Sequence, residues 1–479
     1  MLTPYLTRAG SITQADYGKM SIIYAALPVL KVVFSYGFET TYFRFSGKEQ
    51  HKKSIYSTAF LSIFTSTIFL TGVLLLCQTA FGQAIGLGDS PGIVRVGILI
   101  IAIDTINTIP FAKLRQEGRP VKYAIVNVGG ILVNIFFTWF FVSFCPDHIK
   151  APLVNLIYTP NITPVVYVMI ANFLGSAFTM VLLTSEIKAV RLKFNIPLWK
   201  EMMVYSYPLI IVGMGGVINE TFDRIMLKWW IPGSPDFRDY QVGIYSACYK
   251  LSILITLSVQ AFRMGAEPFF FKQAESANPQ IVYARVMKFF VIVVSIMFLS
   301  VSMFVPVWQI IIGPKFRSGL GIVPILLMAN ICLGIYYNLT IWYKLANRTG
   351  AGAIITVIGA AITLLINYLF IPRYGFYASA WATFICYFSM MVISYLWGQK
   401  VYFVPYAWKK LSAYLVIVLL LFFIHKGITL LWNDSYHIFG LALGGILTLG
   451  YIYFVIQVEK NEFAHIPVLN KFIRNPSTS

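Results

Sequence analysis

Four polar side chains interrupt an apolar stretch that is long enough to cross a membrane. Residues 241–271 read QVGIYSACYKLSILITLSVQAFRMGAEPFFF and contain Lys250, Gln260, Arg263 and Glu267. A span needs about twenty residues, and a charge at the bilayer centre costs roughly 2.5–3.5 kcal/mol on insertion scales. Because Gln260, Arg263 and Glu267 follow one another at helical spacings, they are predicted to share one face that lines a polar cavity.

An earlier stretch of the chain echoes this one. Residues 16–45 read DYGKMSIIYAALPVLKVVFSYGFETTYFRF, and Gly18 and Glu39 match Gly243 and Glu267 with a short gap. Two charged helices at equivalent places in two halves predict a cavity between those halves. The candidate cavity residues of the earlier helix are Lys31, Glu39 and Arg44.

Further charges lie on other predicted spans. Asp104 lies on 93–112, and 205–230 contains Glu220, Asp223 and Arg224. One interpretation is structural, with Glu220 pairing with Arg224, or Asp223 with Lys250, because intramembrane charges require neutralisation. The other is that these carboxylates, with Glu39 and Glu267, take up a proton or another cation during transport. Both interpretations remain open at this point.

Composition places the chain among polytopic membrane proteins. It has 479 residues, of which 58% are hydrophobic and 11% charged, and its mean hydropathy is +0.74. Soluble domains carry about 25% charged residues. The net charge of +19 comes from basic residues in short loops between apolar runs. This distribution follows the positive-inside rule and argues against nucleic-acid binding.

Roughly thirteen apolar runs are predicted to span the membrane. They lie near 20–43, 56–81, 93–112, 121–144, 163–184, 205–230, 241–270, 289–312, 319–343, 350–371, 375–397, 411–431 and 437–457. Alternate loops are rich in Lys and Arg, and these loops are predicted to be cytoplasmic. The C-terminus is therefore expected inside, and the helices at 20–43 and 241–270 are expected to run inward.

A second match between the halves supports an internal duplication. FAKLRQEGRPVKY at 111–123 resembles IWYKLANRTGAGA at 341–353, at an offset close to that of the first echo. Because equivalent loops carry the same charge sign, the repeats are predicted to be parallel. The expected parts are an N-terminal lobe at 1–200 with an incomplete first helix, a second lobe at 201–400, a helix pair at 401–460 and a cytoplasmic tail at 461–479. The alternative is a chain of about thirteen spans whose N-terminus lies outside.

No motif for catalysis or metal binding is present. The sequence has no phosphate-binding GxxxxGK[ST] loop, no GxSxG and no HExxH. The five cysteines are scattered without CxxC spacing, and the five histidines are isolated. We therefore predict no enzyme activity, no catalytic residue, no cofactor and no metal ligand. A glycan polymerase or ligase would need a large outer loop with catalytic residues, and none is predicted.

Several segments together resemble the bacterial polysaccharide flippases. These segments are PYLTR…ADYG, YGFETTYFRF, FAKLRQEGRPVKY, VGIYSACYKL and AFRMGAEPFFF. The resemblance is to the O-antigen and capsule repeat-unit exporters of the multidrug/oligosaccharidyl-lipid/polysaccharide superfamily. It implies an all-α fold of 13–14 spans, with two parallel six-helix lobes, two C-terminal helices and a V-shaped cavity worked by alternating access.

The resemblance also implies a substrate and a location. The substrate would be an undecaprenyl-diphosphate-linked oligosaccharide moved across the bacterial inner membrane, with membrane lipids and a glycan polymerase or other assembly proteins as partners. Related lipid II flippases hold the diphosphate with cavity arginines, for which Arg44 and Arg263 are the nearest candidates and Arg8 a weaker one. The alternative within the superfamily is a multidrug antiporter, for which an acidic cavity is expected.

Overall fold

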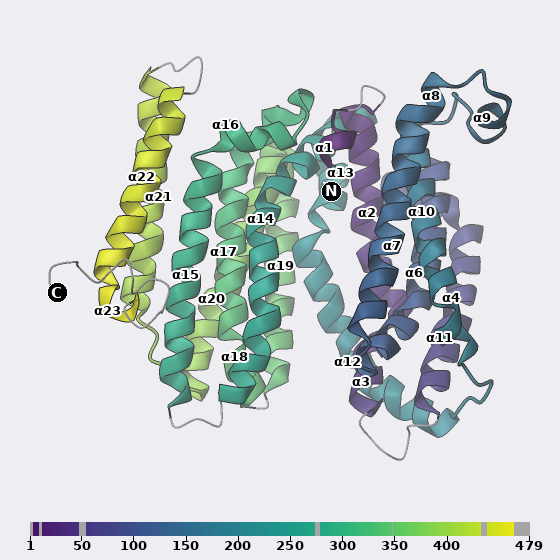
Figure 1. The fold of residues 1–479 in the computed structure, drawn as a ribbon, viewed down its shortest axis with the longest axis horizontal. Coiled ribbons are helices and arrows are strands. Elements are labelled where there is room, and N and C mark those ends of the chain that lie inside the picture. The colour runs from purple at the N-terminus through teal and green to yellow at the C-terminus, as the bar shows by residue number, and fades with distance from the viewer. Residues whose placement is uncertain are drawn as a thin grey trace, which may run out of the picture. The chain divides into compact units, whose positions relative to one another are not determined.

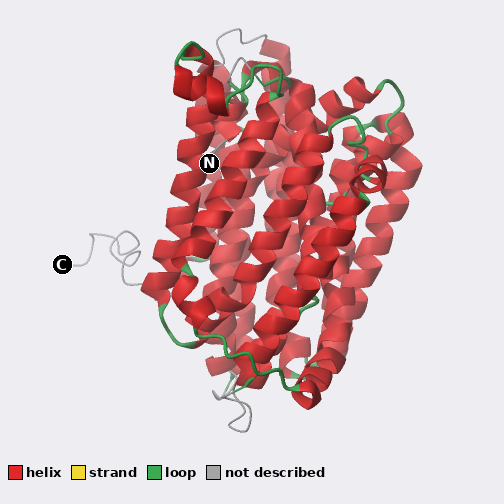
Figure 2. Ribbon diagram, turned by 90° about the vertical axis from the view of Figure 1, so that its right-hand side faces the viewer, coloured by secondary structure: helices red, strands yellow, loops and turns green. Residues whose placement is uncertain are grey.

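The structure is a computed structural model that describes residues 3–8, 12–46, 54–273, 278–346, 348–432 and 438–463. Every regular element in these ranges is a helix, as Figure 2 shows. Thirteen helical segments among the described residues are long and apolar enough to cross a membrane. The prediction of an all-α protein with 13–14 spans is therefore confirmed.

The spanning helices follow the predicted apolar runs. They are α2 (Gln14–Ser35), α4 (Ile55–Leu76), α6 (Pro91–Gln116), α7 (Pro120–Trp139), α10 (Pro164–Leu182), α12 (Ile196–Glu220), α14 (Pro235–Gln273), α15 (Pro279–Ser302), α17 (Val323–Leu339), α19 (Thr349–Tyr374), α20 (Phe376–Val401), α21 (Trp408–Trp432) and α22 (Ile438–Val458). Shorter helices lie between or beside them: α1 (Thr3–Leu6), α3 (Phe38–Ser46), α5 (Gln78–Ala84), α8 (Cys145–Asp147), α9 (Pro152–Ile157), α11 (Thr184–Lys188), α13 (Asp223–Trp230), α16 (Val305–Trp308), α18 (Ile341–Leu345) and α23 (Lys460–Phe463). Proline stands at the start of several of them, where its missing N–H costs nothing.

Two predicted spans are interrupted in the structure. The run at 20–43 is not one helix, because α2 ends at Ser35 and α3 begins only at Phe38. Between them Tyr36 has φ 34° and Gly37 has φ 72°, a left-handed conformation that a helix cannot continue through. The run at 205–230 is likewise divided, between α12 and α13.

The chain folds into two compact units, which are described separately. Unit 1 comprises Met1–Ala247, Ile312–Ser318 and Ala353–Cys386, and unit 2 comprises Cys248–Ile311, Gly319–Gly352 and Tyr387–Ser479. The predicted lobes at 1–200 and 201–400, the helix pair at 401–460 and the tail at 461–479 stay predictions. Most of that tail lies outside the described residues.

Unit 1 combines an apolar cluster with close helix contacts. The cluster joins α3, α4, α6 and α12 through Phe38, Tyr42, Phe45, Ile55, Ala59, Phe60, Ile63, Ile109, Ala112, Leu198 and Met202. Elsewhere α7 and α10 approach each other at Gly130 and Gly175. A Cβ on Gly175 would lie 2.7 Å from the Gly130 carbonyl oxygen. Small residues allow such contacts between membrane helices, where lipid gives helices little hydrophobic drive to associate.

Unit 2 holds its C-terminal helices through a buried carboxylate. The Glu459 side chain, only 2% exposed, pairs with Lys288 of α15 at 2.8 Å and with Lys410 of α21 at 2.6 Å. It also accepts a hydrogen bond of 2.6 Å from the Tyr414 hydroxyl. We call these four residues the Glu459 cluster. It ties α21 and α22, which run side by side in Figure 1, to α15.

Candidate functional site

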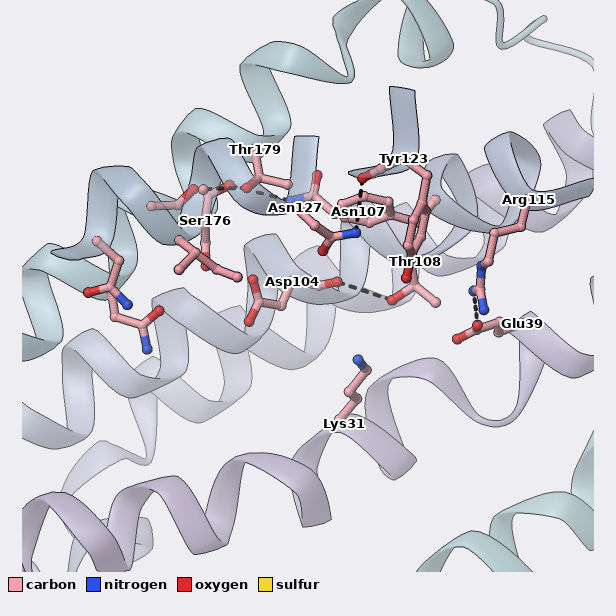
Figure 3. Close-up of a pocket in the computed structure, with 16 residues that line it drawn as sticks. Lys31, Glu39, Asp104, Asn107, Thr108, Arg115, Tyr123, Asn127, Ser176 and Thr179 are labelled. Carbon is pink, nitrogen blue, oxygen red and sulfur yellow. Dashed lines mark hydrogen bonds and ion pairs between the residues drawn. The ribbon is translucent and has the colours of Figure 1, made fainter. Parts of the chain in front are cut away.

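A polar cavity of about 400 Å³ lies within unit 1, among α2, α3, α6, α7 and α10. Its walls carry both signs of charge and many amide and hydroxyl groups (Figure 3). We call it the polar cavity. Its lining residues are Lys31, Glu39, Asp104, Asn107, Thr108, Phe111, Arg115, Tyr123, Asn127, Gly130, Ile131, Asn134, Asn172, Gly175, Ser176 and Thr179.

Lys31 and Asp104 are the two charges in the middle of the cavity. Lys31 lies near the end of α2 and points toward α6, close to Asp104 and Thr108 (Figure 3). Within the described residues, neither Lys31 nor Asp104 makes an ion pair of 4.0 Å or less. The Thr108 hydroxyl is occupied, since it donates to the Asp104 carbonyl at 3.1 Å. No ion pair therefore occupies either charge in the described structure.

Glu39 and Arg115 form an ion pair at one end of the cavity. The Arg115 guanidinium donates to the Glu39 carboxylate from α6 to α3 (Figure 3). The guanidinium also lies 5.2 Å from the Phe43 ring and 5.6 Å from the Tyr123 ring, within cation–π range. Both charged side chains are more than a third exposed, so the pair can open at small cost.

Four asparagines contribute to the remaining polar lining. Asn107 Nδ2 donates to the Ser176 carbonyl at 3.4 Å, and Asn172 Nδ2 donates to the Tyr24 hydroxyl at 2.7 Å. In the described structure the buried Asn107 Oδ1 accepts no hydrogen bond. A buried acceptor without a donor is costly, so a ligand hydroxyl or amide that reached Asn107 would gain a strong contact.

Three helices present these side chains as stripes. On α6 the lining residues are 104, 107, 108, 111 and 115; on α7 they are 123, 127, 130, 131 and 134; on α10 they are 172, 175, 176 and 179. Such spacings of three, four and seven residues put side chains on one helical face. Asp104 and Asn107 on α6 could be recognised from the sequence as polar groups within a span. The polar stripes of α7 and α10 were not predicted, although the periodicity of Asn, Ser and Thr within each span could have revealed them.

Of the predicted site residues whose side chains the structure describes, three line this cavity, namely Lys31, Glu39 and Asp104. Arg44 lies instead over the Tyr205 ring, with its guanidinium carbon 4.4 Å from the ring centre. Glu220 closes α12, and its carbonyl accepts a 3.4 Å hydrogen bond from Arg224. Arg44, Glu220 and Arg224 belong to unit 1, but none of them lines the polar cavity.

Asp223 is held by buried partners. It pairs with Arg224 at 2.8 Å and accepts a hydrogen bond from the Tyr245 hydroxyl. The Arg224 guanidinium also lies 5.6 Å from the Tyr245 ring. The structural interpretation of the sequence paired Asp223 with Lys250, whereas the structure neutralises Asp223 with the adjacent Arg224.

The remaining candidates lie on the part of α14 in unit 2. Lys250, Gln260 and Arg263 are exposed on it. The Arg263 guanidinium lies 4.8 Å from the Tyr337 ring and lines a small cavity with Lys344. The side chain of Glu267 lies outside the described part of the structure. The shared face predicted for Gln260, Arg263 and Glu267 therefore stays a prediction.

Comparison with known proteins gives both a family match and fold matches. The model of a family described as polysaccharide biosynthesis protein matches residues 2–273. Among curated protein sequences no match was found.

Solved structures of two kinds share the fold. An inward-facing multidrug resistance MATE family transporter of the MOP superfamily is 11% identical, with a TM-score of 0.66 over 86% of this chain and 93% of that one. The lipid II flippase MurJ, in an inward closed conformation, is 13% identical, with a TM-score of 0.65 over 95% of both chains. An outward-facing MATE transporter is 14% identical, with a TM-score of 0.55 over 86% and 91%. These likenesses confirm the predicted fold class.

Proposed function

Because this chain belongs to the polysaccharide biosynthesis protein family and is a multi-pass membrane protein, we propose that it carries a lipid-linked oligosaccharide across the membrane. The substrate class is an undecaprenyl-diphosphate-linked repeat unit of a surface glycan. The membrane is the bacterial inner membrane, the C-terminus is cytoplasmic, and transport proceeds by alternating access. No residue has a catalytic role in this proposal.

The polar cavity is the observation that supports the proposal. Amide side chains both donate and accept hydrogen bonds, and a sugar presents hydroxyl groups that do the same. Asn107, Asn127 and Asn172 supply such groups from three helices, while Lys31 and Arg115 supply positive charge for acidic or phosphorylated groups. Polar surface inside membrane helices is costly, so its presence here supports a transport path through this cavity.

A cation-coupled multidrug antiporter is the second candidate. The observation that favours it is Asp104, a cavity carboxylate without an ion pair in the described residues. The inward-facing MATE transporter fits this fold about as well as the lipid II flippase does, with TM-scores of 0.66 and 0.65. Against it, the cavity holds two cations for its two carboxylates, whereas cationic drugs call for a net acidic wall.

The two candidates differ in what accumulates when the protein is absent. Deletion of the gene is expected to remove the surface glycan and to leave its lipid-linked repeat unit on the cytoplasmic leaflet, with unchanged drug susceptibility. The measurements are glycan immunoblots, mass spectrometry of extracted lipid-linked sugars, and growth in the presence of cationic drugs. Normal surface glycan together with increased drug susceptibility would transfer the assignment to the antiporter.

Arg263 allows a separate test of the unit 2 candidates. Arg263→Ala is expected to abolish glycan export while the protein still inserts normally, because the guanidinium would no longer hold a substrate phosphate. The measurement is surface glycan in the deletion strain that carries the variant, with membrane abundance as the control. Full export by Arg263→Ala would remove Arg263 from the proposed site.

A further inference from the structure

A second polar pocket of about 360 Å³ lies within unit 1, and it has no lining residue in common with the polar cavity. Side chains from α3, the start of α4, the end of α6 and the segment between α11 and α12 form its walls. By the predicted orientation it opens on the cytoplasmic side. We call it the basic pocket. Residues 47–53, which connect α3 to α4, lie outside the described structure.

Two cations reach the basic pocket, Lys113 from α6 and Arg191 from the segment before α12. Lys113 Nζ lies 4.4 Å from the Tyr56 ring centre and 3.8 Å from a Glu117 carboxylate oxygen. Glu117 is itself shared, because Arg119 lies 3.4 Å from its other oxygen. Among the described lining residues Glu117 is the one carboxylate, so these residues together carry a net positive charge.

Arg191 is positioned by its backbone, and its guanidinium is left available. The Arg191 N–H donates to Ser57 Oγ at 2.9 Å, which fixes this residue against the first turn of α4. In the described part of the chain, no ion pair of 4.0 Å or less involves the Arg191 side chain. Its exposed guanidinium presents five donors in a planar fork, the geometry that matches phosphate oxygens.

The start of α4 adds further donors to the same wall. Ile55, Tyr56 and Ser57 line the pocket and are the first three residues of this 22-residue helix. The N-cap Ser54 makes no side-chain capping bond. The first backbone N–H groups and the positive end of the helix dipole therefore lie beside the two cations, and both favour an anion.

We propose that the basic pocket binds a phosphate group. A phosphate offers several acceptor oxygens and up to two negative charges, which match a guanidinium fork, an ammonium and free N–H groups better than one carboxylate does. The group comes either from an anionic phospholipid head group or from a soluble diphosphate. Because its lining is separate from the polar cavity, this binding is independent of the proposed transport function.

The test compares two neighbouring cations of one loop. Arg191→Gln removes the guanidinium from the pocket, and Lys193→Gln removes an exposed charge two residues away that does not line it. Purified full-length protein is titrated with inorganic pyrophosphate by calorimetry. The same variants in nanodiscs of phosphatidylglycerol or phosphatidylcholine are compared by thermal unfolding, and Lys113→Gln gives an independent second variant.

Binding or stabilisation is expected to weaken about tenfold in Arg191→Gln and in Lys113→Gln, while Lys193→Gln stays at the parental level. A response to pyrophosphate supports the proposal with a soluble source. A response only to phosphatidylglycerol, lost in the same two variants, supports it with a lipid source. No response to either probe, or equal losses in Arg191→Gln and Lys193→Gln, overturns it. None of these readouts depends on glycan transport.

Discussion

Charged side chains meet in two different settings in this protein, the polar cavity of unit 1 and the Glu459 cluster of unit 2. In the cluster one buried carboxylate has three partners between 2.6 and 2.8 Å. In the cavity, Lys31 and Asp104 face each other without an ion pair in the described residues. The difference separates charges that hold helices together from charges that have no ion pair in the described structure, which we propose are available to a ligand.

Unit 1 also contains a cluster of charges that holds helices together. The two kinds of charged setting are therefore not each confined to one unit. Glu186 is 2% exposed and pairs with Lys122 at 2.7 Å and with Arg119 at 3.2 Å. Burial alone would raise the pKa of this carboxyl, but hydrogen bonds from Lys122 and Ser185 outweigh it and hold the pKa below the ordinary value. A charge with a structural role is therefore identified by its full set of ion-pair and hydrogen-bond partners, more than by its position in the sequence.

The largest expected effect is on the Glu459 cluster. Glu459→Gln leaves Lys288 and Lys410 without their buried counter-charge, and breaking a buried pair costs about 3–5 kcal/mol. Because Lys410 is 39% exposed and can turn to water, we expect the low end, about 3 kcal/mol. The measurement is the melting temperature of purified protein in detergent.

Glu462 is the matched control for that change. It also pairs with Lys288, at 3.1 Å, but it is 28% exposed. Glu462→Gln is expected to cost less than about 1 kcal/mol. Equal losses in the two variants would contradict the view that burial and saturation give Glu459 its role.

The same cluster predicts a dependence of stability on pH. Burial would raise the pKa of Glu459, but hydrogen bonds from Lys288, Lys410 and Tyr414 outweigh it and hold the pKa below 4.5. The folded state thus binds the proton more weakly than the unfolded state does. The contribution of Glu459 is complete above the unfolded pKa and is lost as the pH falls through the lower folded pKa. Melting temperatures between pH 7 and pH 3 should therefore fall less steeply in Glu459→Gln than in the parent.

The next effect in size concerns the helix contact beside the polar cavity. Gly175→Ala places a Cβ 2.7 Å from the Gly130 carbonyl oxygen, and overpacking of this kind costs about 1–3 kcal/mol. Gly216→Ala, where a Cβ meets nothing within 4 Å, is expected to be neutral or stabilising by up to about 1 kcal/mol. Thermal unfolding of both variants checks this. If Gly175→Ala were as stable as Gly216→Ala, the close contact of α7 and α10 would be wrong.

For the polar cavity the expected effect is on transport and not on stability. Lys31→Gln should lower glycan export about tenfold, because one charge-assisted contact with the proposed substrate is lost. The melting temperature should stay unchanged. Lys19→Gln on the same helix is the control, since Lys19 pairs with Asp89 at 2.9 Å and does not line the cavity. A large fall in stability of Lys31→Gln would mean that Lys31 is a structural charge after all.

The smallest effect is predicted for the ion pair of Glu39 and Arg115. Both side chains are partly exposed, and such pairs are worth about 0.2–1 kcal/mol. Glu39→Gln is therefore expected to shift the unfolding free energy by less than about 1 kcal/mol, as measured by thermal unfolding. A loss of several kcal/mol would show that this ion pair stabilises the fold, as the Glu459 cluster does.

The spans could be predicted from the sequence because a membrane helix must bury its own backbone polar groups and present apolar side chains to lipid. The charges inside the spans were visible because they interrupt apolar runs. Several helix starts were not predicted, since α12 begins at Ile196 and α15 at Pro279, nine and ten residues before the apolar runs at 205 and 289. The break at Tyr36 and Gly37 was not predicted, because the hydrophobicity of a run does not indicate which of its residues adopt a left-handed backbone conformation. Partners far apart in the chain could not be predicted either, since Lys288 and Glu459 are 171 residues apart.

The break at Tyr36 and Gly37 changes the cost of inserting the first described span into a bilayer. The 22 residues of α2 rise roughly 33 Å at 1.5 Å per residue, close to the ~30 Å of a hydrocarbon core. If α2 alone crosses the core, Glu39 and Arg44 on α3 fall in the interfacial region, and Lys31 lies about one turn from the helix end. A helix running on through residue 43 would have carried more of these charges through hydrocarbon, at roughly 2.5–3.5 kcal/mol each.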